Sequence, residues 1–294
     1  MLFRSTGWDG RIETAIGGPE PGDADGSFEA ARFYRPQGLA MDGDVLYIAD
    51  TENHLVRAAN LVTRQVSRIA GTGRQGRWGD PGGRADETPF SSPWDLALHG
   101  RLLFVAMAGV HQVWLVDLDR ELAIPYAGSG REARVDGSVE DAAFAQPSGL
   151  ARDRGSLYVA DGESNIIREV ALPPVNQVKT LAGGDLFDFG DADGIGDAVR
   201  LQHPLGVSCA AGKVFIADTY NHRLKVMDPA TRRVRSFAGT GEPGHRDGPA
   251  REAQFYEPGG LCATEQTIFV ADTNNHAIRA IGLADGAVRT LTIC

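Results

Sequence analysis

The chain has 294 residues, 42% of them hydrophobic, which is enough for a sizeable core. Glycine is abundant at 37 residues and charged residues make up 23%, so the composition excludes a disordered polymer and favours an all-β protein with many turns. The net charge of −10 argues against nucleic acid as a general partner, because phosphate binding needs a basic face.

The cysteines and the apolar segments bear on location. Cys209, Cys262 and Cys294 form no C-x-x-C pair, and their odd number favours free thiols in a reducing compartment. No apolar stretch approaches the ~20 residues that span a bilayer, so we expect no membrane partner. The first ten residues lack the apolar core of a signal peptide. We therefore expect a cytoplasmic protein.

The chain begins with a fragment of a repeat. Residues 2–18 (LFRSTGWDGRIETAIGG) predict two strands joined by a Gly-Trp-Asp-Gly turn, equivalent to the last two strands of the complete repeats that follow. Outer strands without inner ones would expose a sheet edge. We therefore expect the native polypeptide to begin upstream of Met1; the alternative is a ring that closes in an unusual way.

Five complete repeats follow. A Pro-x-[Gly/Asp]-[Leu/Val] element opens each one, at prolines spaced 57, 54, 57 and 54 residues apart, and an Ala-Gly element ends the first four. We expect four strands per repeat, a to d, of which b and d are nearly continuous apolar runs, typical of strands covered on both faces. The central twelve residues align without gaps as LYIADTENHLVR (46–57), LFVAMAGVHQVW (103–114), LYVADGESNIIR (157–168), VFIADTYNHRLK (214–225) and IFVADTNNHAIR (268–279).

The Asp-Thr-x-Asn-His element followed by Arg resembles the NHL repeat. The resemblance implies an all-β, NHL-type β-propeller, here with five complete four-stranded blades plus a partial N-terminal blade on a six-bladed template. A d–a loop of sixteen to nineteen residues lengthens the repeat beyond the usual ~40–45 residues. We expect one domain, 1–294, with blade units at about 1–31 (partial), 32–88, 89–142, 143–199, 200–253 and 254–294.

Phrases that differ between blades make the resemblance more specific. They are SPWDLA (92–97), AMAGVHQVW (106–114), AQPSGLA (145–151), LFDFGDADG (186–194), LQHPLGV (201–207), ADTYNH (217–222) and ADTNNHAIR (271–279). In content and order they are similar to successive blades of the NHL-repeat-containing protein 2 family, in which a thioredoxin-like domain precedes a six-bladed propeller. No residue here matches a thioredoxin active site, so the redox activity implied by the resemblance is not assigned to this chain.

Antiparallel strands place the b–c turns and the d–a loops on one face, which we call the turn face. Its loops are acidic, so the face is expected to repel phosphate backbones and to attract cations or basic protein segments. Simple solvation of polar loops is the alternative. Residues 17–32, 74–89, 131–146, 185–203 and 242–257 carry net charges of −3, 0, −2, −4 and −2.

The most acidic loop contains a candidate calcium site, because clustered carboxylates beside glycines suit a hard cation. It departs from an EF-hand, since Phe189 takes the first ligand position and Arg200 the last. Asp-Gly turns in a polar loop are the alternative, and we otherwise expect no cofactor. The candidate ligands are Asp188, Asp191, Asp193 and Asp197.

A recurring pair of residues marks the b–c turns. Because it recurs once per blade, we expect a structural role in which the Asp caps turn amides and the His packs over the turn; the alternative is that the histidines converge to bind a metal. Met107 and Asn165 interrupt the pattern. The recurring residues are Asp50, His54, His111, Asp161, Asp218, His222, Asp272 and His276.

Two further residues are candidates for the channel of a propeller. Asp95 replaces the Gly of the Pro-x-Gly element in the second blade, and His203 directly precedes Pro204. A structural hydrogen bond is the alternative for Asp95. The basic residues that end the twelve-residue block could in principle bind RNA, an alternative that the acidic loops disfavour. They are Arg57, Arg168, Lys225 and Arg279.

The sequence contains no G-x-S-x-G elbow, P-loop, H-E-x-x-H motif or nucleotide fingerprint. The leading hypothesis is a non-enzymatic scaffold that binds a protein or peptide, with a basic partner favoured by charge and no nucleic acid. A metal-dependent propeller lyase or hydrolase acting on a small molecule is the alternative. A third hypothesis is a redox component that works with a thioredoxin-like domain or partner.

Overall fold

A computed structural model describes residues 3–6 and 12–292 of the chain. It divides into two compact units, residues 1–130 with 292–294 and residues 131–291, which we call unit 1 and unit 2 and describe separately. The predicted Gly-Trp-Asp-Gly turn lies outside the described residues. The assignment of the whole chain to one domain stays a prediction.

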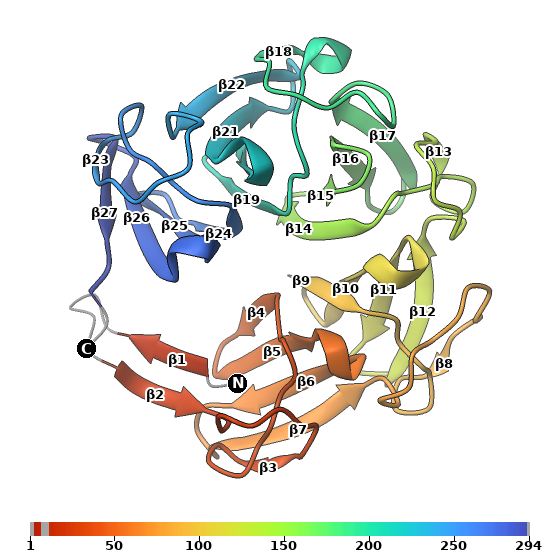
Figure 1. The fold of residues 1–294 in the computed structure, drawn as a ribbon. Coiled ribbons are helices and arrows are strands. Elements are labelled where there is room, and N and C mark those ends of the chain that lie inside the picture. The colour runs from red at the N-terminus through yellow and green to blue at the C-terminus, as the bar shows by residue number, and fades with distance from the viewer. Residues whose placement is uncertain (1–2, 7–11, 293–294) are drawn as a thin grey trace. The chain divides into compact units, whose positions relative to one another are not determined.

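Unit 1 begins with the predicted fragment of a blade and continues with two complete sheets (Figure 1). The fragment is an antiparallel pair, β1 (Phe3–Thr6) with β2 (Ile12–Ile16). The first complete sheet contains β3 (Gly26–Ser27), β4 (Leu39–Asp42), β5 (Val45–Asp50), β6 (Leu55–Asn60) and β7 (Gln65–Ala70). The second contains β8 (Gly83–Arg84), β9 (Pro93–His99), β10 (Leu102–Met107), β11 (Gln112–Asp117) and β12 (Leu122–Ala127).

Unit 2 holds three sheets of the same construction. The first contains β13 (Gly137–Ser138), β14 (Pro147–Asp153), β15 (Ser156–Asp161), β16 (Ile166–Ala171) and β17 (Gln177–Ala182). The second contains β18 (Gly194–Ile195), β19 (Gly206–Ala210), β20 (Lys213–Asp218), β21 (Arg223–Asp228) and β22 (Arg233–Ala238). The third contains β23 (Gly248–Pro249), β24 (Pro258–Ala263), β25 (Thr267–Asp272), β26 (Ala277–Gly282) and β27 (Ala287–Thr290).

Four strands of each complete sheet are the predicted strands a to d, joined in antiparallel order, and the NHL-type propeller fold is confirmed. Each sheet also has a fifth, two-residue strand that the repeat did not predict. It comes from the d–a loop just ahead of each predicted blade boundary and pairs with strand d, as β3 does with β7. The loop therefore folds back along the outer edge of the next sheet and covers it.

The helical segments are short 3₁₀ turns, most of them between strands b and c. No helix in the described part of the chain is long and apolar enough to cross a lipid bilayer. The 3₁₀ turns are η1 (Thr51–Asn53), η2 (Ala108–Val110), η3 (Gly196–Ala198), η4 (Thr219–Asn221) and η5 (Thr273–Asn275).

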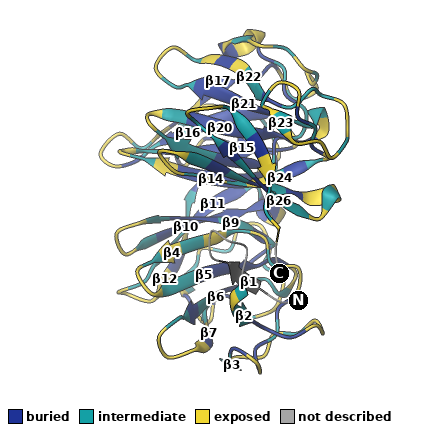
Figure 2. Ribbon diagram, turned by 90° about the vertical axis from the view of Figure 1, so that its left-hand side faces the viewer, coloured by how far each residue is buried: buried dark blue, intermediate teal, exposed yellow. Residues whose placement is uncertain are grey.

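Within each unit the core lies between neighbouring sheets, so the middle strands are buried while the loops are exposed (Figure 2). In unit 1 Leu103, Val105 and Trp114 of the second sheet pack with Val56 of the first. Burial on both faces explains why strand b is an unbroken apolar run rather than an alternating one.

The glycine of the Pro-x-Gly element has a packing role in unit 2. There the innermost strands of successive sheets, β14, β19 and β24, approach closely at this position. A methyl group at Gly149 would lie 2.5 Å from the carbonyl oxygen of Leu205, and one at Gly206 would lie 2.2 Å from that of Gly259. Only a residue without a side chain allows these backbones to approach so closely.

Candidate functional site

A buried cation recurs on strand c, at the last position of the twelve-residue block, in four of the five complete sheets. Arg57, Arg168, Lys225 and Arg279 are all 0% exposed. Each faces the aspartate that ends strand b: the guanidinium of Arg168 lies 3.3 Å from Asp161, for example. These four cations are therefore inaccessible to RNA, which argues against the alternative that this row binds RNA. The other pairs are Arg57–Asp50 at 3.0 Å, Arg279–Asp272 at 2.7 Å and Lys225–Asp218 at 3.9 Å.

A second carboxylate reaches each buried cation from the preceding d–a loop, 32 residues earlier in the chain. In the first sheet of unit 2, Arg168 donates to Asp136 at 2.9 Å, and the backbone N–H of Thr180 on β17 also donates to Asp136, at 3.0 Å. The carboxylate thus fastens the loop to strand d. The equivalent loop residues are Asp25, Asp193 and Asp247.

The apolar neighbour of the cation changes with the cation. Arg57, Arg168 and Arg279 lie over phenyl rings, with Cζ-to-centroid distances of 5.2, 4.9 and 5.0 Å, whereas the ring position of the Lys225 repeat is Leu201. The Nε atoms of the three arginines are buried without a hydrogen-bond partner in the described part of the chain. Stacking on an aromatic face suits the planar guanidinium better than the compact ammonium group. The rings are those of Phe33, Phe144 and Phe255.

The four candidate calcium ligands are ion-pair partners in the structure. Asp191 and Asp193 both accept hydrogen bonds from the Lys225 ammonium group, at 2.6 and 3.0 Å. Across residues 3–6 and 12–292, no three His, Cys, Asp or Glu side chains gather in a way that could hold a metal ion. These two loop carboxylates therefore pair with a buried cation of the protein itself. The remaining pairs are Asp188–Arg200 at 3.1 Å and Asp197–Arg232 at 3.0 Å.

The second blade replaces the whole charged group by apolar residues. Met107 and Trp114 stand where the other blades have the Asp and the Arg or Lys, and Gly82 stands where they have the loop Asp. The Trp114 ring contacts Phe90 edge to face, and its Nε1 donates to Gln112 at 3.0 Å. One chain thus contains a charged and an apolar solution to the same packing problem.

The turn histidines occupy a left-handed backbone conformation, with φ between 51° and 56° at His54, His111, His222 and His276. His54 Nδ1 accepts a hydrogen bond from the backbone N–H of Ser92, at the start of the next blade. Asn165 has the same conformation (φ 57°), and its Oδ1 accepts from the His203 N–H at 2.7 Å. Since Asn and His both tolerate positive φ, the exchange of His for Asn preserves the connection between blades.

Two replacements of His54 distinguish a structural role, in the turn and in the hydrogen bond between blades, from a role in metal binding. His54→Asn should keep the stability of the protein, whereas His54→Ala should lower it by about 1–3 kcal/mol through the lost hydrogen bond and the strained φ. Burial lowers the pKa of His54, against the attraction of Glu52 for the protonated ring. Its contribution is therefore present above its unfolded pKa and is lost as the pH falls through the lower folded value. Chemical denaturation at pH 7 and pH 5 checks both effects; equal stability of the two variants would contradict the role.

The two channel candidates have local explanations. Asp95 lies on β9, where its Oδ1 accepts from the Leu96 N–H at 2.8 Å and packs against Gly38, just ahead of β4. His203 lies ahead of β19 in the left-handed conformation shared by the residues before the repeat prolines, and it stacks on Tyr220 of η4 with ring centroids 4.7 Å apart. Burial lowers the pKa of His203, against the attraction of Glu163. These contacts place His203 beside a b–c turn of unit 2.

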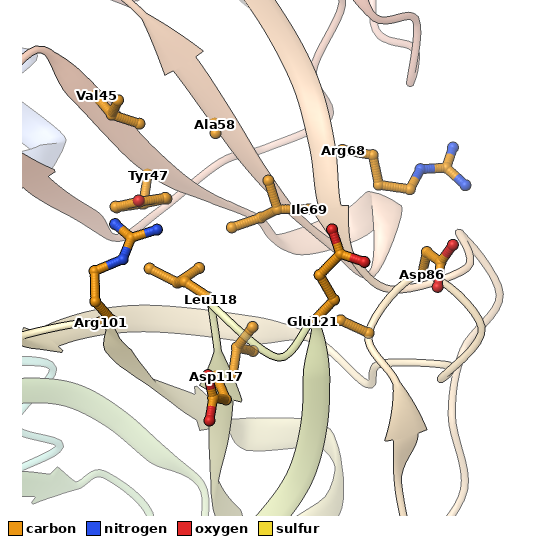
Figure 3. Close-up of a pocket in the computed structure, with 12 residues that line it drawn as sticks. Val45, Tyr47, Ala58, Arg68, Ile69, Asp86, Arg101, Asp117, Leu118 and Glu121 are labelled. Carbon is orange, nitrogen blue, oxygen red and sulfur yellow. The ribbon is translucent and has the colours of Figure 1, made fainter.

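A pocket of about 320 Å³ opens between the two complete sheets of unit 1 (Figure 3). Its lining includes Ala58 and Ile69, at positions where the next blade has the larger Leu115 and Tyr126. These smaller side chains leave space beside Tyr47, which also lines the pocket. Arg101 at its rim pairs with Asp42 and Asp119, at 3.2 and 3.0 Å. The guanidinium is thus already neutralised by the protein.

The turn face of unit 2 carries large apolar side chains that face solvent. Phe187 is 85% exposed and Phe189 62% exposed, both in the loop between β17 and β18. The Asp188 N–H donates to the Asp185 carbonyl oxygen at 2.8 Å, which closes a turn with Phe187 near its tip. The Asn221 side chain of η4 donates to the Gly190 carbonyl oxygen, so the loop lies against a b–c turn. Tyr220 and Tyr256 are also exposed on this face.

Known proteins place this architecture in a family. The NHL repeat profile matches residues 33–58 and 255–281. NHL repeat-containing protein 2 of Bos taurus and of Homo sapiens are each 41% identical over 97% of this chain, and "Protein SUPPRESSOR OF QUENCHING 1, chloroplastic" of Arabidopsis thaliana is 44% identical over 91%. The chain spans 44% of the length of the first two relatives and 27% of the third.

Solved structures support the fold. A chain of the nidogen/laminin complex has a TM-score of 0.63 at 17% identity, over 90% of this chain and 81% of that one. A structural genomics protein of unknown function from Bacteroides thetaiotaomicron has a TM-score of 0.67 at 15% identity, over 92% of this chain and 60% of that one. Together with the repeat motifs and the blades, these likenesses show that the chain belongs to the NHL-repeat β-propeller family and is similar over nearly its whole length to NHL repeat-containing protein 2.

Proposed function

We propose that the chain is a protein-interaction module whose turn face on unit 2 binds a partner segment rich in basic residues. The observation that carries the proposal is the pair of exposed phenylalanines, Phe187 and Phe189, on an acidic loop. Exposed aromatic side chains on a rigid scaffold supply the apolar contacts of protein interfaces. The acidic surroundings select the charge of the partner.

The charge of this face comes from loops of unit 2. The three d–a loops there carry net charges of −2, −4 and −2. Asp185 and Glu242 are exposed within them, and Glu163 is exposed in a neighbouring b–c turn. A partner that places an apolar side chain on the phenylalanines and Lys or Arg beside these carboxylates would match both features.

The structure decides which acidic residues can test the proposal. Neutralising Asp191 or Asp193 would remove one carboxylate partner of the buried Lys225 and destabilise the blade, so lost binding would be ambiguous. Asp185 and Glu242 form no ion pair among the residues that the structure describes, and Asp185→Asn with Glu242→Gln leaves every buried cation paired. Phe187→Ser with Phe189→Ser removes the apolar contacts without touching the core.

A display selection of random twelve-residue peptides against the purified full chain tests the function. We expect selected peptides to be enriched in Lys and Arg, and to bind the Phe187→Ser/Phe189→Ser and Asp185→Asn/Glu242→Gln variants at least about tenfold more weakly than the parent. Arg235→Gln, on the exposed surface of β22, is the control. Selected peptides without basic enrichment, or with equal affinity for both variants, would contradict the proposal.

The proposal assigns any redox chemistry to a thioredoxin-like domain or partner and not to this module. Burial raises the pKa of the Cys209 thiol to about 12, so it remains protonated and unreactive at physiological pH. Cys209 and Cys262 are both free, which supports a reducing, cytoplasmic setting as part of the proposal.

A further inference from the structure

An exposed tryptophan stands at the tip of a turn in unit 1. Residues 77–80 (Arg-Trp-Gly-Asp) lie in the loop between β7 and β8, where the Asp80 N–H donates to the Arg77 carbonyl oxygen at 3.4 Å. Gly79 has a φ of 86°, as the third residue of a type II turn requires. Trp78 takes the second position and is 67% exposed. The turn therefore directs a large apolar side chain away from the core.

The indole ring is held in place although it is exposed. Trp78 Nε1 donates to the Ser129 carbonyl oxygen at 2.9 Å, and a methyl group at Gly130 would lie 2.0 Å from the ring. The Gly76 N–H donates to the Phe90 carbonyl oxygen at 2.7 Å and fixes the start of the loop. A side chain immobilised before binding loses little conformational entropy on contact with a partner.

Two exposed arginines accompany the tryptophan. Arg74 and Arg77 have no carboxylate within ion-pair distance in the described residues, whereas Arg68 and Arg84 of the same unit pair with Asp23 and Asp86. The loop at 74–89 is also the one d–a loop without net negative charge. Unpaired guanidinium groups on a chain of net charge −10 are available to a carboxylate from outside.

We propose that the Arg74–Trp78 loop docks an acidic segment of a partner protein. The guanidinium groups of Arg74 and Arg77 bind two of its carboxylates, and an apolar side chain between them stacks on the Trp78 indole. An acidic peptide is favoured over nucleic acid because, among the described residues, this loop offers two exposed cations without a carboxylate partner, too few to follow a phosphate backbone. The other d–a loop of unit 1 carries a charge of −3. The site is independent of the acidic face of unit 2 and takes a ligand of opposite charge.

Fluorescence anisotropy with the full chain tests the site. The probe is the labelled peptide Gly-Glu-Asp-Phe-Leu-Asp-Glu-Gly, compared with the same peptide carrying Gln and Asn in place of Glu and Asp. We expect saturable binding of the acidic probe that weakens with salt, and at least about tenfold weaker binding by Arg74→Gln/Arg77→Gln and by Trp78→Ala. Arg120→Gln, exposed in the β11–β12 turn, should bind as the parent does.

Equal binding of the neutral peptide, unchanged affinity in both loop variants, or no saturation below about 1 mM probe would each overturn the proposal. Tighter binding of a fifteen-nucleotide oligo-dT would overturn it in favour of a single-stranded nucleic acid. Because both arginines are exposed, their double variant gives an answer even if Trp78→Ala fails to fold. Failure here leaves the unit 2 selection unaffected, since that selection uses other residues and basic peptides.

Discussion

Replacing Arg168 by methionine is expected to lower the free energy of unfolding by about 3–5 kcal/mol, the cost of leaving a buried charge without its partner. Asp161 is fully buried against Arg168, and Asp136 is half-exposed beside it. Methionine would therefore leave the Asp161 carboxylate in the core without its cation. Urea denaturation measures the loss. Arg235→Met, on the exposed surface of β22, should change stability by no more than about 0.5 kcal/mol.

The destabilisation of the Arg168 variant should depend on pH. Burial already raises the pKa of Asp161, against the attraction of Arg168, and removing the cation raises it further. A carboxyl whose folded pKa is raised binds its proton more tightly in the folded state, so stability falls as pH rises from the unfolded value toward the folded one. The loss should therefore be larger at pH 8 than at pH 5. A smaller loss at pH 8 would mean that Asp161 does not depend on Arg168.

The second blade supplies a rescue for the same variant. Asp136→Gly, Asp161→Met and Arg168→Trp together install the residues that Gly82, Met107 and Trp114 provide there. Replacing a whole buried ion group by apolar residues is often neutral, whereas removing one member is not. The triple variant should be more stable than Arg168→Met alone. If it is less stable, the charged group does more than fill and fasten the blade.

Gly206→Ala is the second change with a large expected effect, a loss of about 3 kcal/mol or a failure to fold. The added methyl group would meet the Gly259 carbonyl oxygen at 2.2 Å, and neither β19 nor β24 can withdraw without breaking its own ladder. Gly155→Ala is the matched control, because no atom lies within 4 Å of its added methyl group. Equal melting temperatures for the two variants would show that the inner strands can separate.

The repeat predicts the strands correctly because its signals are local. Apolar runs and the proline of the Pro-x-[Gly/Asp] element recur in every complete repeat, and the turn motif recurs in most of them. Five complete blades and an outer fragment could therefore be identified without the structure. The fifth strand of each sheet was missed, since two residues such as Gly137–Ser138 carry no periodic signal. Its pairing with β17 depends on where the loop folds, which the local pattern does not reveal.

The partners of the buried cations were missed although a signal was present. An Asp-Gly pair stands 32 residues before each of them, at Asp25, Asp136, Asp193 and Asp247, and Gly82-Gly83 replaces it before Trp114. In the acidic loop, Asp193 and its neighbour Asp191 resemble ligands of a calcium site. The sequence does not show that the buried Lys225 pairs with both of them. The sequence shows which charged residues a loop contains, but only the packing of the folded chain decides which of them remain without an ion-pair partner.

The residues proposed for binding illustrate the same limit. Phe187, Phe189 and Trp78 look like ordinary apolar residues in the sequence, and a core role would be the default for each. Their exposure follows from tight turns held by Asp185 and Gly79, whose geometry appears once the chain is folded. Sequence therefore identifies the scaffold, and structure identifies the surfaces that it presents.

The most direct test of the proposed function measures binding and unfolding on one variant. A basic peptide from the display selection is titrated into the parent chain and into Phe187→Ser/Phe189→Ser, and the melting temperature of each protein is recorded in the same buffer. We expect at least about tenfold weaker binding with a melting temperature changed by no more than about 2 °C, since both side chains face solvent. Unchanged affinity, or weaker binding only with a lower melting temperature, would contradict the assignment of this face as the binding surface.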